Sequence, residues 1–410
     1  MLIFCSCGTM VVSSEKREVQ VYFDQDYAGN VGMVSWYLSD ETQNTNAIFQ
    51  TGQSPNLTFD LLGEEFQFLS AKVVHCNHDW RPSGLSDLEI LQTPNEFQIE
   101  NAQYSLNTIQ PYTIYSVTLP PVSTSGNYAV VVYDDNDENN IIFTRRFVVY
   151  SNEVVIEAQI TYSNVPNQRQ THHQITFDID YGKLTLFNPI AELRTAILQN
   201  HNWSKAITDL KPSTMRLDQQ FLGYYQYNGE NEFAAGNELR FADVRATRFR
   251  GLNVQSVTRT RNGFEIRLEN DKPRANIAYS NLFQDRNGQF SIENQNPGQD
   301  NLQADYLTTY FTLESTANIG DVFVEGKFNN WTPDRRHTMT YNENLQRYEG
   351  SLILKQGLYD YQYSLIGNGK NVIEGDFVQT QNDYEILLYY RNPKTNADEV
   401  IGYRFLSSGN

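Results

Sequence analysis

Alternation of apolar and polar side chains at every second residue is the feature that most limits the folds open to this chain. It is clearest in residues 174–181, 348–354 and 359–365, where aromatic and aliphatic side chains recur at alternate positions with one glycine among them. Successive side chains of a β-strand point to opposite faces, so this spacing predicts strands with one buried face. No long stretch repeats its apolar residues at helical spacing, and we therefore predict an all-β fold.

Turn signals separate the predicted strands. Asn-Gly pairs begin at residues 228, 262, 287 and 368, and this dipeptide favours hairpins because both residues tolerate positive φ. The alternating runs 348–354 and 359–365 also predict a hairpin. Residues 188–200 fit either a short helix capped by Asn188 or a strand, and we predict the strand.

A further hairpin is predicted near residue 136. Runs 128–133 and 141–150 are rich in Val, Ile, Phe and Tyr and flank the acidic cluster 134–138. Carboxylates can bind calcium, but this cluster has no glycine at the EF-hand position and no distal glutamate in register. We expect a solvated hairpin tip.

The length of the chain predicts several domains. Its 410 residues exceed what one hydrophobic core usually fills, and its 26 Tyr and 23 Phe against 5 Met suit half-buried β surface. We predict a flexible tail and three tandem antiparallel β-sandwich domains. The predicted ranges are the tail at 1–18, the sandwiches at 19–150, 151–295 and 303–410, and a polar, turn-rich linker at 289–303.

Charge and hydropathy exclude two classes of partner. The formal charge is -18 and the pI about 4.8, whereas binding to a nucleic-acid backbone requires clustered Lys and Arg. No stretch approaches the roughly 18 apolar residues that span a bilayer. We expect no nucleic-acid partner and no spanning segment.

The three cysteines, Cys5, Cys7 and Cys76, cannot build a disulfide framework. Residues 1–7 are a short apolar run that ends in Ser-Cys and is similar to the end of a bacterial lipoprotein signal, although the basic region and most of the apolar region are missing. Cys7 is therefore a candidate for lipid attachment. The alternative is an unstructured tail.

The stretch His75–Leu85 has side chains that suit a metal site. Two histidines, a cysteine and an aspartate within five positions could be zinc ligands. However, residues 66–76 have the composition of a strand, which would point His75 and Cys76 to opposite faces. We interpret His75, Cys76 and a buried Trp80 as framework, and predict neither a metal nor a catalytic residue here.

Two charged clusters have alternative interpretations. Glu230, Glu232 and Glu238 lie among tyrosines and could supply the paired carboxylates of a glycosidase, but acidic residues are common in the turns of an acidic chain, so we predict no enzyme. Residues 240–274 contain nine basic and four acidic residues. Such a patch could orient a partner, or its arginines could pair with carboxylates elsewhere on the sheets. The candidate docking residues are Arg240, Arg245, Arg248, Arg250, Arg259 and Arg261.

Several short segments occur in the order found in one protein family. They are His75–Ser83, Pro111–Tyr115, Ser125–Tyr128, Thr144–Phe147, Asn237–Phe241, Leu354–Tyr361 and Tyr389–Arg391. Over roughly residues 19–404 the chain resembles the type IX secretion system plug proteins. In this resemblance Tyr128 and Arg146, like Trp80, enter as framework.

The resemblance implies a protein of tandem β-sandwich domains in the periplasm, at the inner face of the outer membrane. It implies that the protein closes the periplasmic end of the outer-membrane translocon β-barrel by steric occlusion. It implies no catalysis, no cofactor and no small-molecule substrate.

The third predicted domain has a narrower resemblance. Residues 324–331 and 348–361 are similar to early-set immunoglobulin-like modules that bind glycogen and starch, in which exposed tryptophans stack on sugars. That implies a carbohydrate-binding alternative in which Trp331 stacks and Asn329, Asn330 and Lys355 orient the glycan. In the interpretation we prefer, Trp331 is a core or edge residue and the module is a spacer.

Overall fold

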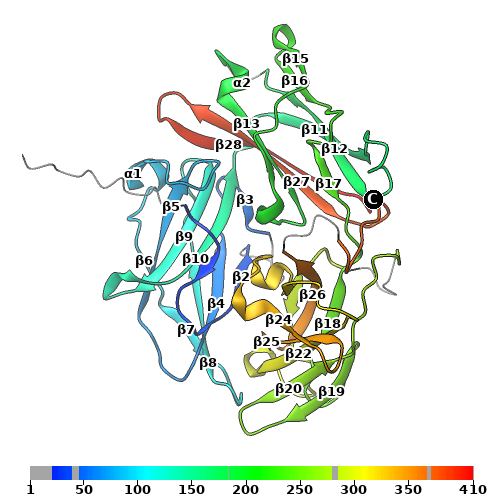
Figure 1. The fold of residues 1–410 in the computed structure, drawn as a ribbon. Helices are drawn as coiled ribbons and strands as arrows, with labels where there is room; N and C mark the ends of the chain where they lie inside the picture. The colour runs from blue at the N-terminus through cyan, green and yellow to red at the C-terminus, as the bar shows by residue number, and fades with distance from the viewer. Residues whose placement is uncertain (1–20, 39–45, 183, 279–284, 367–370, 410) are drawn as a thin grey trace, which may run out of the picture.

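The computed structural model describes residues 21–38, 46–182, 184–278, 285–366 and 371–409. Its regular structure is almost entirely β (Figure 1), and the predicted all-β fold is confirmed. The only α-helices of the described residues are the single turns α1 (Asp87–Ile90) and α2 (Pro189–Glu192). None of the helices described is long and apolar enough to cross a membrane.

The first sandwich is built from residues up to Tyr150. One layer has the strand order β2-β4-β8-β7, and the facing layer is the β10-β9-β5-β6 half of a ten-stranded sheet, with β1 and β3 also paired to β10. The strands are β1 (Gln25–Asp26), β2 (Val31–Tyr37), β3 (Ile48–Gln50), β4 (Asn56–Leu62), β5 (Leu69–Cys76), β6 (Phe97–Gln98), β7 (Asn101–Tyr104), β8 (Tyr112–Thr118), β9 (Gly126–Asp134) and β10 (Asp137–Tyr150). Aromatic rings fill the core between the layers: Phe59 stacks on Tyr115 at 5.3 Å and meets Phe143 edge-on at 4.8 Å. β9 and β10 pair as the predicted hairpin.

The second sandwich combines residues from two distant parts of the chain. One layer has the order β11-β12-β16-β15, with β17 also on β12, and the facing layer is the β14-β13-β27-β28 half of the ten-stranded sheet. The strands are β11 (Val155–Tyr162), β12 (His172–Asp180), β13 (Leu193–Gln199), β14 (Ile207–Thr208), β15 (Thr214–Arg216), β16 (Phe221–Tyr224), β17 (Glu232–Ala234), β27 (Asp383–Asn392) and β28 (Ala397–Ser407). Phe177 stacks on Tyr224 at 4.3 Å in this core. For residues 188–200 a short helix and a strand were both considered, and both are present. The helical turn α2 leads directly into the strand β13.

The third sandwich is a nine-stranded sheet that curves around its own core. The order is β18-β26-β23-β24-β25-β22-β20-β19, with β21 on β26. The strands are β18 (Arg240–Asp243), β19 (Val254–Arg259), β20 (Phe264–Leu268), β21 (Phe290–Ile292), β22 (Tyr306–Glu314), β23 (Val322–Glu325), β24 (Thr338–Asn342), β25 (Arg347–Lys355) and β26 (Gly357–Leu365). The alternating tyrosines 359, 361 and 363 are all buried in this core, as their spacing predicted.

These sheets do not follow the predicted boundaries. β18, β19, β20 and β21 were predicted in the second domain but belong to the sheet of the third, and β27 and β28 were predicted in the third but belong to the second. The third sandwich is thus inserted between β17 and β27. Alternation shows which residues form strands but not which distant strand lies beside them, and the predicted linker 289–303 even contains β21.

Three predicted hairpins are wrong for a related reason. β25 pairs with β22 and β24, whereas β26 pairs with β18, β21 and β23. Only Gln356 separates β25 from β26, which is too short for a two-residue hairpin turn, so the chain crosses to a different part of the sheet. The Asn-Gly pair at 262 does join the hairpin β19–β20, but the pair at 228 lies between β16 and β17, which both pair with β12. The pair at 287 precedes β21, and the pair at 368 lies outside the described residues.

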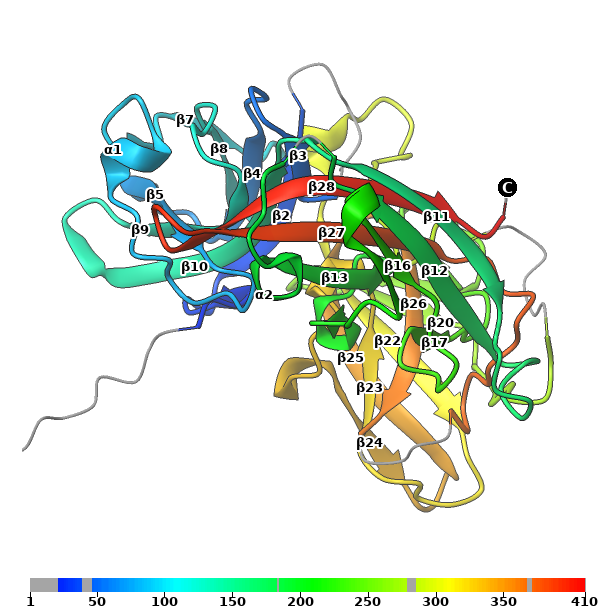
Figure 2. The same ribbon diagram turned by 90° about the horizontal axis from the view of Figure 1, so that it is seen from above.

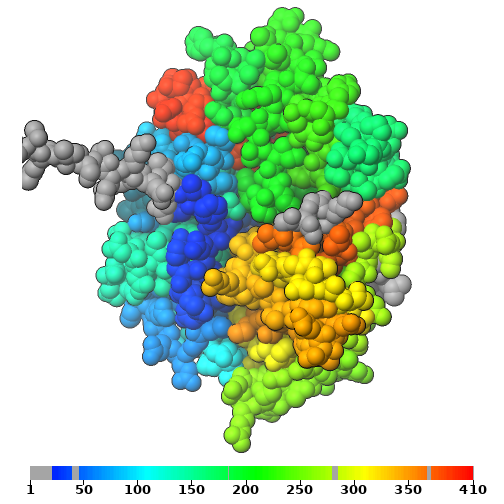
Figure 3. All heavy atoms as spheres, in the orientation of Figure 1, coloured from blue at the N-terminus to red at the C-terminus, as the bar shows by residue number. Residues whose placement is uncertain are grey.

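The three sandwiches pack against one another. Tyr150 of β10 pairs in parallel with Val400 of β28, which joins the first and second sandwiches in one sheet, and Figure 2 shows β28 running on from β10 toward β11. The space-filling view shows the first (blue and cyan), second (green and red) and third (yellow-green to orange) bodies in contact on one face (Figure 3).

Candidate functional site

The end of β5 and the turn after it lie where the first and second sandwiches meet. Nδ1 of His75 is 2.8 Å from Oγ of Ser83, its Nε2 is 3.1 Å from the carbonyl oxygen of Ser125, and its ring meets Tyr128 edge-on at 4.9 Å. Burial lowers the pKa of His75 to about 4 and raises the pKa of Cys76 to about 12. Both side chains are therefore neutral at pH 7, and Cys76 is not a ready thiolate ligand.

The other polar residues of this turn contact separate partners. Nδ1 of His78 lies 2.8 Å from Oδ2 of Asp398 on β28, and Nε of Arg391 on β27 lies 2.8 Å from Oδ1 of the same carboxylate. Burial alone would raise the pKa of Asp398, but hydrogen bonds from His78 and the charge of Arg391 hold it below its usual value. Asp79 pairs instead with Arg81 at 2.6 Å. Over the described ranges, no three His, Cys, Asp or Glu side chains are grouped to hold a metal ion.

Trp80 is part of an aromatic contact between the first two sandwiches. Its ring meets that of Trp203 edge-on at 4.8 Å, and the guanidinium of Arg146 lies 4.8 Å from the Trp80 ring and 5.5 Å from the Trp203 ring. Arg146 is held by Asp24, whose Oδ2 is 3.0 Å from its Nε. Stacking of a cation on two rings adds to the burial of apolar area, so Trp80, Trp203 and Arg146 fix the turn against the second sandwich.

A buried ion pair joins the first and third sandwiches. Nζ of Lys355 on β25 is 2.7 Å from Oδ2 of Asp60 on β4, and the hydroxyl of Tyr306 donates to the same oxygen at 2.6 Å. Tyr306 also accepts the backbone N–H of Met33 at 2.8 Å, and Lys355 lies 4.3 Å from the ring centre of Tyr112. A buried charge pair is tolerated best when further hydrogen bonds support it, and here Oδ2 of Asp60 accepts from both Lys355 and Tyr306.

Residues of all three sandwiches meet at Asn46. Its Nδ2 donates to Oε1 of Glu385 on β27 at 3.0 Å, and its Oδ1 accepts from Nζ of Lys327. His201, which follows β13, lies 2.9 Å from the other oxygen of Glu385. Burial lowers the pKa of Lys327 to about 8, although the charge of Glu385 raises it. Asn46 of the first sandwich is thus hydrogen-bonded both to Glu385 of the second and to Lys327 of the third.

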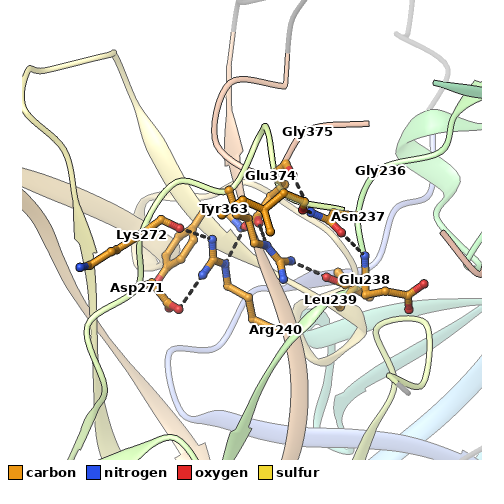
Figure 4. A network of polar contacts seen from close by, with 12 residues as sticks. Gly236, Asn237, Glu238, Leu239, Arg240, Asp271, Lys272, Tyr363, Glu374 and Gly375 are labelled. Carbon is orange, nitrogen blue, oxygen red and sulfur yellow. Dashed lines mark hydrogen bonds and ion pairs between the residues drawn. The ribbon is translucent and has the colours of Figure 1, made fainter. Parts of the chain in front are cut away.

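The two connections between the second and third sandwiches run side by side. The carboxylate of Glu374, on the returning connection, accepts from Nε of Arg240 at 3.0 Å (Figure 4). It also accepts from Nε of Arg274 at 2.5 Å. Arg240 also pairs with Asp271 at 2.6 Å, and Asn237 donates to the carbonyl oxygen of Glu374 at 3.0 Å. Two hydrogen-bonded connections restrain the third sandwich more than one flexible linker would.

The structure corrects the predicted arginine patch. Arg240 is buried in the network just described, and Arg245 pairs with Asp243 and Glu293 at 2.8 and 2.9 Å, so neither can dock a partner as a free charge. The exposed arginines form two groups at opposite ends of β19. Arg248 and Arg250 precede the strand, and Arg259 and Arg261 lie at its end.

The structure places Trp331 in the core, as in the interpretation preferred above, and argues against the alternative glycan site. Trp331 is only 3% exposed, so a sugar cannot stack on its ring. A Cβ added to Gly288 would lie 2.2 Å from the Trp331 ring, which shows how closely the backbone packs on it. Asn329 binds the backbone at Val324 and Gly326, Asn330 ends the same 3-10 turn with φ of 52°, and Lys355 is bonded to Asp60. The four residues therefore serve local structure and the junction.

Three other features were singled out from the sequence: the three glutamates, the acidic cluster 134–138 and Cys7. Glu232 accepts from Ser163 at 2.7 Å, buried Glu238 accepts the backbone N–H of Gln381 at 2.8 Å, and Glu230 lies in an exposed turn. The acidic residues 134–138 form the tip of the β9–β10 hairpin. Cys7 lies outside the described residues.

The residues of the junctions were missed from the sequence. Asp60, Tyr306, Lys327, Glu385 and Asp398 lie in separate segments and match no motif. The one signal available was a charged residue inside an apolar strand, as in Asp60 within NLTFDLL and Glu385 within DYEILLYY, because a charge at such a position usually has a buried partner.

Comparisons with known proteins agree with this architecture. Residues 33–151 match the family model described as type 9 secretion system plug protein 1st domain. A crystal structure of a hypothetical protein from Parabacteroides merdae ATCC 43184 is similar to this chain, with a TM-score of 0.88 and 29% identity over 95% of this chain and 100% of that one. A marsupial T cell receptor is similar only at a TM-score of 0.16 and 11% identity, covering 41% of this chain and 73% of that one, which supports no argument. No curated protein matches the chain.

Proposed function

We propose, from the match of residues 33–151 to the type 9 secretion system plug protein 1st domain, that the protein is a non-catalytic plug. In this proposal it acts in the periplasm at the inner face of the outer membrane, and Cys7 is the candidate site of a lipid anchor. There it closes the periplasmic end of the translocon β-barrel by occupying the opening.

One observation carries this proposal: each of the three pairs of sandwiches is held together by direct contacts. The first and second share a sheet and the Trp80–Trp203 contact, the first and third share the Lys355–Asp60 pair, and the second and third share two connections. Steric occlusion needs a body that does not deform when pressed against an opening. Buried ion pairs and close-packed aromatic cores resist such deformation.

The proposal is tested by the conductance of the translocon. The barrel purified without this protein and placed in a planar bilayer should pass a large ionic current, and adding the protein to its periplasmic side should block that current. Addition to the opposite side is the control and should have no effect. A barrel that stays open at saturating protein, or a protein that never co-purifies with the translocon, would contradict the proposal.

A further inference from the structure

Strand β11 is the outer strand of its sheet. All eight residues from Val155 to Tyr162 pair with β12 in continuous register, from Val155 opposite Asp180 to Tyr162 opposite His173, without a bulge. In an antiparallel ladder alternate residues direct their backbone N–H and C=O groups away from the partner strand. Among the described residues, no hydrogen bond reaches the outward groups of residues 156–162.

Several other edge strands among the described residues are protected in ways that β11 is not. β6 and β14 have two residues each, β15 has three and β7 has four. β19 has a bulge after Val254 and ends in Arg259, and the open side of β2 faces the third sandwich, where Met33 bonds Tyr306. Proteins protect edges by short strands, bulges, charges or covers, because an open regular edge pairs with other chains. β11 is long and regular and has one charged residue, Glu157.

The side chains of β11 suit an added strand. Ile156 is buried, and Ala158 and Ile160 are only partly covered at the margin of the second core. Val155 and Tyr162 are 55% and 66% exposed. A neighbouring strand with apolar side chains on its inner face would extend this core past Ile160.

β28 lies at the same opening. A Cβ on Gly402 would be 3.1 Å from Cδ1 of Ile156, so the middle of β28 lies close to the start of β11. Beyond Ile401, β28 has no strand on the side away from β27 among the described residues. Figure 2 shows β28 and β11 curving together along this side of the molecule.

We propose that the outer edge of β11 binds an extended segment of the outer-membrane partner as an added β-strand, an inference that rests on the proposed function. The complement of unpaired backbone donors and acceptors is another extended backbone. A second copy of this chain is a poor occupant, because both copies would have a charge of -18. The exposed carboxylates of Glu153, Glu157 and Asp180 surround the edge, so the segment alternates apolar residues with Lys or Arg.

Hydrogen exchange of the full chain, alone and bound to the purified translocon, tests this directly. In the free protein the outward amides of residues 156–162 should exchange fast. In the complex they should exchange at least about tenfold more slowly, with the inward amides protected in both states. A complex without added protection in β11 overturns the strand inference and leaves the plug function standing, whereas no complex at all overturns both. Protection that rises with concentration of the protein alone would make a second copy the occupant and also overturn the inference.

A pair of variants isolates the edge. Val155→Lys with Gln159→Lys adds two cations to exposed positions of β11 and should weaken translocon binding by about tenfold or more, because edge lysines oppose strand addition. The matched control is Ile353→Lys with Ser351→Lys, two exposed positions on β25, which has a strand on each side. Equal loss of affinity in both variants would contradict the inference. Unchanged unfolding midpoints show that both variants fold.

Discussion

Lys355 and Asp60, 295 positions apart in the sequence, form an ion pair with Nζ 2.7 Å from Oδ2, and their side chains are 7% and 4% exposed. The pair lies between β25 of the third sandwich and β4 of the first. Because both charges are withdrawn from water, each depends on the other for its solvation. The contact is therefore a sensitive point for testing whether the sandwiches act as one body.

Replacing Lys355 by Met should destabilise the protein by about 3–5 kcal/mol, since it leaves Asp60 charged and buried with only neutral partners. Chemical denaturation at pH 7 measures this. The double variant Asp60→Leu with Lys355→Met removes both charges and should recover most of the loss. A single variant as stable as the wild type would show that the two sandwiches part easily at this contact.

Lowering the pH should reduce the free energy of unfolding, because His75 takes up a proton more readily in the unfolded chain. Its pKa in the folded protein is about 4, against a usual value of 6.5. Between pH 7 and pH 5 the unfolded chain therefore takes up a proton that the folded chain does not, which lowers the free energy of unfolding by about 2 kcal/mol. Urea unfolding of His75→Gln at both pH values should lack this part of the loss.

The control for that experiment is His172→Gln, at a partly exposed position on β12. It should keep the wild-type difference between pH 7 and pH 5. If His75→Gln also keeps that difference, the buried imidazole is not the group that titrates.

Trp331→Ala should act on stability and not on glycan binding. Truncating a buried tryptophan costs about 3–5 kcal/mol, and Trp331→Phe, which keeps part of the ring, should cost less. Both are measured by denaturation, with a glycan array on the wild type as the second readout. A glycan signal abolished by Trp331→Phe at unchanged stability would revive the carbohydrate-binding alternative.

Reversing Arg248 and Arg250 to Glu should slow association with the translocon about three- to tenfold at low salt, because exposed charges steer encounter more than they hold the complex. The difference should shrink at high salt through screening. Arg259→Glu with Arg261→Glu, at the other end of β19, is the comparison of equal charge. If both pairs slow association equally, net charge and not a local patch explains the effect.

Local regularities of the sequence predicted the strands well. Tyrosines 359, 361 and 363 alternate and all lie in one core. The hairpin β9–β10 was predicted by two apolar runs around an acidic tip, because hairpin pairing depends on neighbouring residues and a turn.

Pairing between distant segments could not be predicted in this way. β25 and β26 follow each other closely, yet each pairs with strands from elsewhere. The same holds for Lys355. Its charge suggested a role at the surface, whereas in the structure it is buried and pairs with Asp60 of β4.

The sequence by itself determined that this chain forms β-strands with aromatic inner faces, because strand periodicity and turn chemistry act over a few residues. Only the tertiary structure decided that the C-terminal hairpin returns to the second sandwich, that Trp331 is buried, and that Arg240 pairs with Glu374 inside the protein. The physical reason is that burial and the partners of a charge depend on which surfaces meet in space. In an all-β chain those surfaces come from strands hundreds of residues apart.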